Sequence, residues 1–160
     1  MENLEELKRK YEELGKEIER LEKNKGRCRV DEGECYYKVS DCGRVEYADE
    51  NLHVFDDFRY KTRNYFKTQE EAQTHLDNIN TYYELMDLAE ELNDGEKINW
   101  EDEDQEKFYI TFNFILNNIV QDYSRYIKRI GSIYCLDEDF LEKAKERIGE
   151  ERLIKLFRGE

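Results

Sequence analysis

The sequence predicts an α+β fold, because segments with helical spacing of apolar residues alternate with segments in which apolar and polar residues alternate. Two further observations shape this prediction. Residues 1–26 carry a heptad pattern, and the remainder contains two runs with the same order of elements. We therefore predict an N-terminal coiled-coil-like helix over residues 1–26 and one α+β domain of antiparallel hairpins and helices over residues 27–160.

The heptad pattern places one apolar seam along the N-terminal helix, and Gly26 lies just past its end. Three heptads make a marginally stable lone helix, so the seam must pack against a second copy of the chain or against the domain. In an antiparallel pair Lys10 would lie near Glu17 of the second copy, whereas a parallel pair would bring Glu17 near Glu22. We predict a homodimer through the seam residues Leu4, Leu7, Tyr11, Leu14, Ile18 and Leu21.

The first run of elements begins with alternating apolar residues on either side of "SDCG", which predict a hairpin with Gly43 in its turn. A loop, "ENLHVFDDFRYKTR", then leads to a short strand, "NYF". Thr68 and Glu71 form the capping-box pattern that opens a helix of about 25 residues. "NDG" at residues 93–95 ends this helix.

The second run repeats this order. "FYITFNF" alternates as a strand does, residues 117–118 form a plausible hairpin turn, and "IVQDYSRY" returns beside the first strand. A short strand in "GSIYC" precedes the helix "EDFLEKAKERIG", which Gly149 interrupts before "EERLIKLF". We predict two similar hairpin–short strand–helix units, residues 34–95 and 107–157, joined by an acidic bridge over residues 96–106.

The net charge of −14 is concentrated in one part of the chain. Residues 27–124 hold 24 acidic and 10 basic side chains, whereas the two ends nearly balance. Direct binding of nucleic acid is disfavoured, because a phosphate backbone requires clustered lysine and arginine. The negative segment either keeps the protein soluble or attracts a basic partner. Its candidate partner-binding residues are Trp100, Glu101, Asp102, Glu103, Asp104, Asp56 and Asp57. Trp100 either fixes the bridge to the sheet or forms an exposed anchor.

Catalytic and metal sites are not expected. Cys28, Cys35 and Cys42 stand seven residues apart, whereas structural zinc usually takes ligand pairs two to four residues apart. An EF-hand loop starting at Asp102 would need glycine at its sixth position, where Lys107 stands. Because no nucleophile or phosphate-loop motif is present, we predict a non-enzymatic protein without metal or cofactor. With no apolar membrane-length run and a charged start, it is expected in the cytoplasm.

Three segments carry a resemblance to known proteins: "DDFRYKTRNYFKTQEEAQTHL", "NWEDEDQEKFYITFN" and "IGSIYCLDEDFLEKAKERIGEERLIKLF". They resemble a family of small acidic, mostly uncharacterised proteins of phages and prophages of low-GC Gram-positive bacteria, over about residues 34–157. The resemblance implies action against host machinery or host defence, and it transfers no active site. We expect a phage-type inhibitor whose acidic surface occupies a basic, nucleic-acid-binding surface of a host protein. The alternative is a sponge for a nucleotide or other small ligand, bound in a pocket at the dimer interface.

Overall fold

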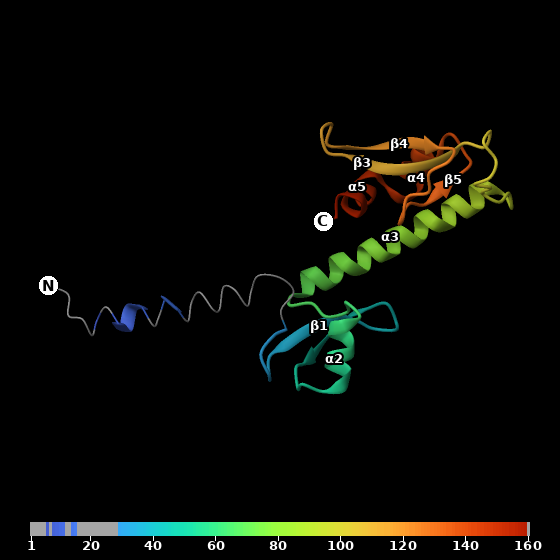
Figure 1. Ribbon diagram of the computed structural model, residues 1–160. Helices are drawn as coiled ribbons and strands as arrows, with labels where there is room; N and C mark the ends of the chain where they lie inside the picture. Colours follow the sequence, from blue (N-terminus) through green and yellow to red (C-terminus); the bar gives the residue numbers. More distant parts are fainter. Residues whose placement is uncertain (1–5, 7, 12–13, 16–28, 160) are drawn as a thin grey trace.

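The computed structural model describes residues 6, 8–11, 14–15 and 29–159 of the chain. It confirms a mixed α+β fold with two small antiparallel sheets. The sheets belong to two lobes, and the long helix α3 (Gln69–Asn93) contributes to both (Figure 1). Within the described part of the chain, no helix is long and apolar enough to cross a membrane.

The N-terminal lobe is built on the hairpin of β1 (Cys35–Val39) and β2 (Val45–Asp49), in which Tyr37 pairs with Tyr47. Its turn contains Gly43 at φ +67°, a backbone conformation that glycine adopts at no steric cost. Phe66 adds to the other side of β1 through an antiparallel bridge to Tyr37. The predicted hairpin is therefore present, and the predicted strand "NYF" is reduced to one bridge.

A helix, α2 (Val54–Lys61), occupies the segment that the sequence predicted to be a loop, and that prediction is wrong. His53 is its N-cap: Nδ1 accepts from the N–H of Phe55 at 3.4 Å, and the Asp56 carboxylate accepts from the N–H of His53 at 3.0 Å. This capping box satisfies backbone donors that a helix N-terminus leaves without partners. Eight residues are too few to show a clear helical period in the sequence.

Helix α3 begins and ends where the sequence predicted. The Thr68 hydroxyl accepts from the N–H of Glu71 at 3.1 Å, and the Glu71 carboxylate accepts from the N–H of Thr68 at 3.2 Å. Asp94 ends the helix in the left-handed conformation, at φ 44°. The N-terminal part of α3 buries Ala72 and Leu76, whereas its C-terminal part contributes to the main apolar core.

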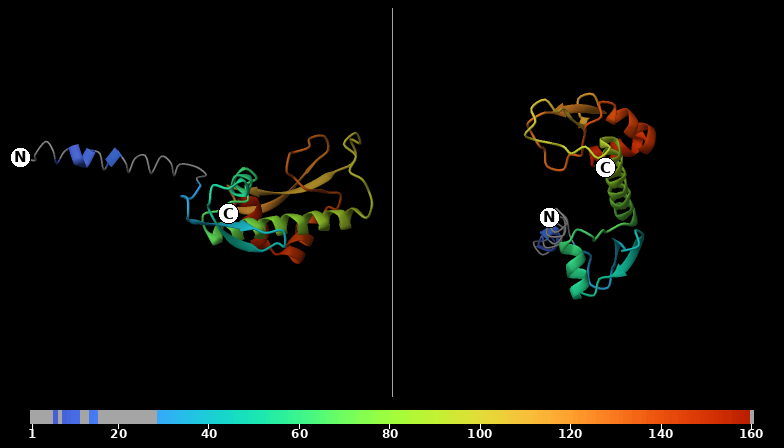
Figure 2. Two further views of the ribbon diagram at one scale, coloured as in Figure 1. Left: turned by 90° about the horizontal axis from the view of Figure 1, so that it is seen from below. Right: turned by 90° about the vertical axis from the view of Figure 1, so that its right-hand side faces the viewer.

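The C-terminal lobe is a sheet with strand order β4–β3–β5, formed by β3 (Lys107–Asn113), β4 (Asn118–Ser124) and β5 (Tyr134–Cys135). Helices α4 (Phe140–Ile148) and α5 (Glu150–Arg158) cover one face of this sheet (Figure 2). Gly149, at φ +97°, separates the two helices. Apolar side chains from α3, the sheet, α4 and α5 form one core, which includes Leu85, Ile110, Phe112, Ile119, Phe140, Ala144 and Leu153.

The N-terminal lobe is held by buried polar and aromatic groups rather than by a large apolar core. Glu50 is fully buried and accepts hydrogen bonds from Arg29 Nη2 at 2.7 Å and from the hydroxyl of Tyr65 at 2.7 Å. Tyr65 stacks on Tyr36, with ring centroids 4.0 Å apart. Burial raises the pKa of Glu50, but the hydrogen bonds from Arg29 and Tyr65 outweigh it, and the pKa lies below its ordinary value. Glu50 therefore remains charged inside the lobe.

Asp56 is a second buried carboxylate of the N-terminal lobe and is only 4% exposed. We call the buried groups around Glu50 and Asp56 the polar layer. Its carboxylate accepts from the hydroxyl of Tyr36 at 2.7 Å and lies 3.5 Å from the guanidinium of Arg59. Asp57 is partly exposed and forms an ion pair with Arg29. Both aspartates were predicted to lie in a loop and to contact a partner. They lie instead in α2, where Asp56 is buried and Asp57 is already paired.

Replacing Asp56 with Ala should strongly destabilise the N-terminal lobe. The hydroxyl of Tyr36 and the N–H of His53 would lose their acceptor, and Arg59 would lose its carboxylate. The expected loss is about 3 kcal/mol of unfolding free energy, because removing one member of a buried network leaves the others unsatisfied. Urea unfolding followed by circular dichroism measures this loss.

The matched control is Asp57→Ala, one residue further on. Its surface ion pair with Arg29 should contribute about 0–1 kcal/mol. Equal losses for the two variants would contradict the buried network described above.

Candidate partner-binding surface

The acidic bridge, residues 96–106, connects α3 to β3 and has a defined shape in the structure. Gln105 joins its two ends, because Oε1 accepts from the N–H of Asn99 at 2.7 Å and Nε2 donates to the carbonyl of Lys97 at 3.4 Å. The side chain of Asn99 accepts from the N–H of Glu101, and that of Asp102 accepts from the N–H of Asp104. These local bonds order the bridge without help from a helix or a strand.

Four carboxylates project from this loop into solvent: Glu101, Asp102, Glu103 and Asp104. We call them the bridge carboxylates. None of them forms an ion pair with a residue that the structure describes, whereas their neighbour Glu106 is paired with Arg125 at 2.6 Å. Four adjacent negative charges therefore face solvent without an ion-pair partner among the described residues.

Lys107, directly after the bridge, is the residue that anchors it. The side chain is fully buried, and Nζ donates to the backbone carbonyls of Asp102 at 2.9 Å and Arg125 at 3.2 Å. The ammonium thus fastens the middle of the bridge to the loop that follows β4. It also places one positive charge beneath the four bridge carboxylates, which offsets part of their mutual repulsion.

Trp100 covers this ammonium. Its ring centroid lies 5.5 Å from Nζ of Lys107, within the range of a cation–π contact. The ring also meets Tyr134 edge to face, at 4.9 Å between centroids and 86° between planes. Trp100 is only partly exposed. Of the two alternatives for this residue, the geometry favours fixation of the bridge to the sheet over an exposed anchor.

Sequence reasoning identified Trp100 and the carboxylates but missed the anchoring role of Lys107. One feature of the sequence indicates that Lys107 is buried. It begins an apolar strand, and the alternation of side chains puts it on the same face as Tyr109, which is buried. Charge alone does not show whether such a lysine is buried, because that depends on the acceptors that the fold places around it.

The cysteines and histidines that the structure describes do not come together in one site. Cys35 lies opposite Asp49 at the first residue of β1, whereas Cys42 lies in the turn at the other end of that strand. Cys135 is buried in the apolar core, and Cys28 lies outside the described residues. His53 caps α2, whereas His75 lies on α3 against the ring of Phe66. Among the described side chains there is no cluster of three or more potential metal ligands.

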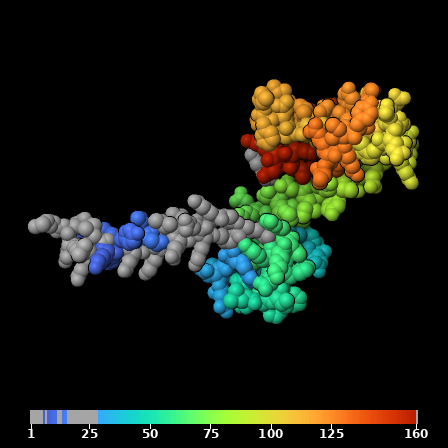
Figure 3. Space-filling model, viewed as in Figure 1, coloured from blue at the N-terminus to red at the C-terminus, as the bar shows by residue number. Residues whose placement is uncertain are grey.

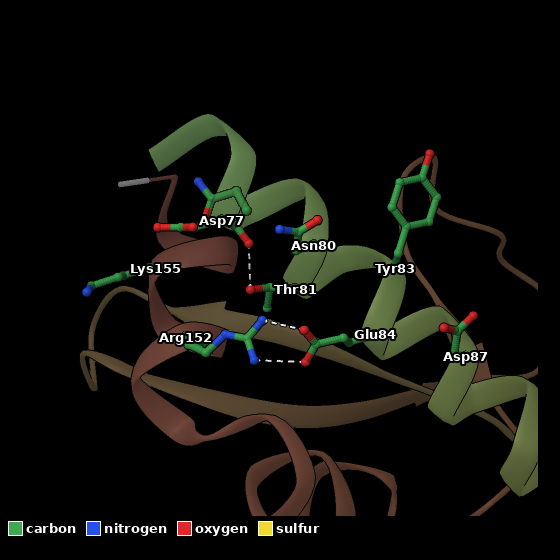
Figure 4. Close-up of a pocket in the computed structure, with 9 residues that line it drawn as sticks. Asp77, Asn80, Thr81, Tyr83, Glu84, Asp87, Arg152 and Lys155 are labelled. Carbon is green, nitrogen blue, oxygen red and sulfur yellow. Dashed lines mark hydrogen bonds and ion pairs between the residues drawn. The ribbon is translucent and has the colours of Figure 1, made fainter. Parts of the chain in front are cut away.

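A cavity of about 560 Å³ lies between α3 and α5 (Figure 4). Arg152 lines this cavity, and its guanidinium donates two hydrogen bonds of 2.7 and 2.8 Å to the carboxylate of Glu84. Asp77 and Asp87 also line the cavity. Lys155 also lines the cavity, and its ammonium is paired with Glu151 at 2.9 Å. This cavity does not suit a phosphate group, because both of its cations are already paired and two further carboxylates would repel an anion.

No protein-family model, curated protein or solved structure matches the chain in the comparisons made.

Replacing Lys107 with Met should loosen the bridge without unfolding the lobe. Each hydrogen bond from a charged donor contributes about 1.5–3 kcal/mol, so amide exchange in residues 99–106 should accelerate about tenfold or more. Hydrogen exchange with mass spectrometry measures this change, and circular dichroism checks the fold.

Lys97→Met is the matched control, because Lys97 belongs to the same bridge but is exposed. It removes the same charge without removing a buried donor. If both variants accelerate exchange equally, Lys107 is not the anchor of the bridge.

Proposed function

We propose that this protein is a non-catalytic binding protein whose bridge carboxylates engage a basic surface of another protein. The observation that carries the proposal is the presentation of four exposed, unpaired carboxylates on a loop held by a buried lysine. Glu106, the last residue of the bridge, is by contrast paired with Arg125 at 2.6 Å. A surface used only for solubility does not require its charges to be held in a fixed arrangement.

Electrostatic attraction gives such a surface a physical advantage. A patch of one sign raises the rate of encounter with an oppositely charged partner and disfavours partners of the same sign. The preformed bridge also reduces the conformational entropy lost on binding. The resemblance of the sequence to phage and prophage proteins makes a host protein the proposed partner, and a nucleic-acid-binding surface would supply the basic residues. Cytoplasmic action is part of this proposal.

The alternative of a nucleotide sponge receives less support. In the cavity between α3 and α5, Arg152 is bound to Glu84. A second cavity, between α2 and the β1–β2 hairpin, contains Arg59, but this side chain donates to the hydroxyl of Tyr36 at 2.6 Å. Neither arginine is available to a phosphate without breaking an existing bond.

The homodimer through residues 1–26 remains part of the proposal. Leu4, Leu7, Ile18 and Leu21 lie outside the described residues, but Tyr11 and Leu14 are helical and exposed. These two seam residues do not pack on either lobe, which supports a second copy as the partner of the seam. A dimer would present two acidic bridges at once and increase avidity for a partner with two basic sites.

We also propose that the two lobes are variants of one structural unit. In the first, Phe66 pairs antiparallel with the first strand of the β1–β2 hairpin, and a helix follows. In the second, β5 pairs antiparallel with the first strand of the β3–β4 hairpin, and a helix follows. The order hairpin, third extended segment and helix is thus the same, and α2 is an insertion in the first lobe.

Reversing the four bridge carboxylates to Lys should abolish binding of the basic partner. The variant changes the net charge from −14 to −6, because each of the four reversals adds two. Its melting temperature should hardly change, since exposed charges contribute little to stability. Capture from a Gram-positive host lysate, quantified by mass spectrometry against the unmodified protein, measures the loss.

A control variant reverses four other exposed acidic residues: Glu32, Asp41, Glu138 and Asp139. It has the same net charge and should retain the partner. If both variants lose the partner, net charge rather than the bridge is responsible. If neither does, the carboxylates serve solubility and the proposal fails.

Replacing Leu14 and Ile18 with Asp should break the heptad seam and lower the number of chains per particle. The substitutions place charges in the apolar interface, which cannot solvate them. Sedimentation velocity measures the change in mass. A wild-type protein that is already monomeric, or a variant with unchanged mass, would show that the seam does not join two copies.

A further inference from the structure

A cavity of about 270 Å³ lies beside the acidic bridge. Its walls come from the C-terminal half of α3, from the bridge and from the segment that ends in β5. Figure 3 shows these parts together at one end of the C-terminal lobe, with α3 in green, the bridge in yellow and the segment before β5 in orange. The aliphatic and aromatic side chains that line the cavity are Tyr82, Met86, Ala89, Ile98, Ile133 and Tyr134.

Hydrogen bonds hold the walls of this cavity in place. The hydroxyl of Tyr134, which is buried, accepts from the N–H of Arg129 at 2.7 Å. The carboxamide oxygen of Asn93, at the end of α3, accepts from the N–H of Leu136 at 2.8 Å. Because the ring of Tyr134 also meets Trp100 edge to face, one wall of the cavity belongs to the structure that fixes the bridge. A preformed cavity of this kind loses little conformational entropy when a group enters it.

The volume of the cavity indicates what can occupy it. Pockets that hold whole small ligands typically measure about 300–1,000 Å³. This cavity is smaller, and it suits one large apolar side chain of another protein. Side chains seated in such pockets contribute much of the binding free energy of protein interfaces. Met86 in the wall is flexible, so the cavity can adapt to apolar side chains of different shape.

The charges around the cavity favour a basic partner. Glu90 is exposed and is the one charged residue among the described residues that line the cavity. The last turn of α3 contains no basic residue, so the negative end of the helix dipole is not compensated there. The bridge carboxylates begin three residues after Ile98 and add four negative charges. An anionic ligand is therefore repelled, and a cationic one is attracted.

We propose that this cavity receives an apolar side chain of the basic partner, while lysines or arginines beside that side chain meet Glu90 and the bridge carboxylates. The cavity then forms the apolar part of the same binding surface, so this inference rests on the proposed function. Attraction between charges mainly accelerates association, whereas a buried apolar anchor slows dissociation. The partner is thus a protein segment in which an aromatic or aliphatic residue is flanked by basic residues.

The test uses the full-length protein and three peptides with blocked ends: Lys-Lys-Phe-Lys-Lys, Lys-Lys-Ser-Lys-Lys and Ser-Ser-Phe-Ser-Ser. Trp100 is the single tryptophan of the chain and contacts Tyr134 in the cavity wall, so its fluorescence measures the binding of each peptide. Lys-Lys-Phe-Lys-Lys should bind about tenfold or more tightly than either of the other two, because burial of the phenylalanine and attraction between charges then act together.

Two variants of the cavity check where the phenylalanine binds. Ser132 lines the cavity, so Ser132→Phe should fill it, and Tyr82→Ser should remove part of its apolar wall. Each should lower the affinity for Lys-Lys-Phe-Lys-Lys to that for Lys-Lys-Ser-Lys-Lys, which should itself not change. Asn118→Phe is the matched control, because it adds the same ring at an exposed position at the far end of the sheet. It should change neither affinity, and circular dichroism checks that every variant is folded.

Equal affinities for the two lysine peptides, or a difference that persists in both cavity variants, would overturn the proposal. So would a protein that binds none of the peptides, or one that binds Ser-Ser-Phe-Ser-Ser as tightly as Lys-Lys-Phe-Lys-Lys. Reversing the four bridge carboxylates to Lys separates this inference from the proposed function. If the reversal leaves the binding of Lys-Lys-Ser-Lys-Lys unchanged, the proposed function fails, and this inference fails with it. If the reversal removes that binding but phenylalanine adds no affinity, only this inference fails.

Discussion

The burial of the Lys107 ammonium is the interaction on which the candidate binding surface depends. A buried cation is costly unless its hydrogen bonds are satisfied, and here two backbone carbonyls and the face of Trp100 surround it. One of those carbonyls belongs to Asp102, in the middle of the acidic bridge. The lysine therefore couples the end of the sheet to the loop, and the carboxylates can face solvent together instead of separating under their own repulsion.

The two lobes are stabilised in different ways, and α3 connects them. The C-terminal lobe has an apolar core built from all its elements, whereas the N-terminal lobe relies on the polar layer around Glu50 and Asp56. Buried charges of this kind contribute less net stability than apolar packing. They do, however, require each buried group to keep one particular hydrogen-bond partner. The candidate binding surface lies on the lobe with the apolar core, which gives the bridge a rigid support.

The elements with local signals were predictable from the sequence. The capping box at Thr68 and the left-handed end at Asp94 define α3 through contacts between neighbours in the chain. Gly43 likewise marks the turn of the first hairpin. Helix α2 was missed because it is short and depends on Asp56, whose carboxylate also accepts from Tyr36 twenty residues earlier. The exposed bridge carboxylates could be identified from composition, but Lys107 could not, because its acceptors come from two separate loops.

The salt dependence of association tests the central claim most directly. The partner captured from a host lysate would be purified, and its association rate constant with this protein measured as ionic strength rises from low to above physiological. The account predicts a fall of about tenfold or more, because steering between opposite charges is screened beyond a Debye length of about 8–10 Å. An association rate that is independent of salt would contradict the claim that the acidic bridge recognises a basic surface.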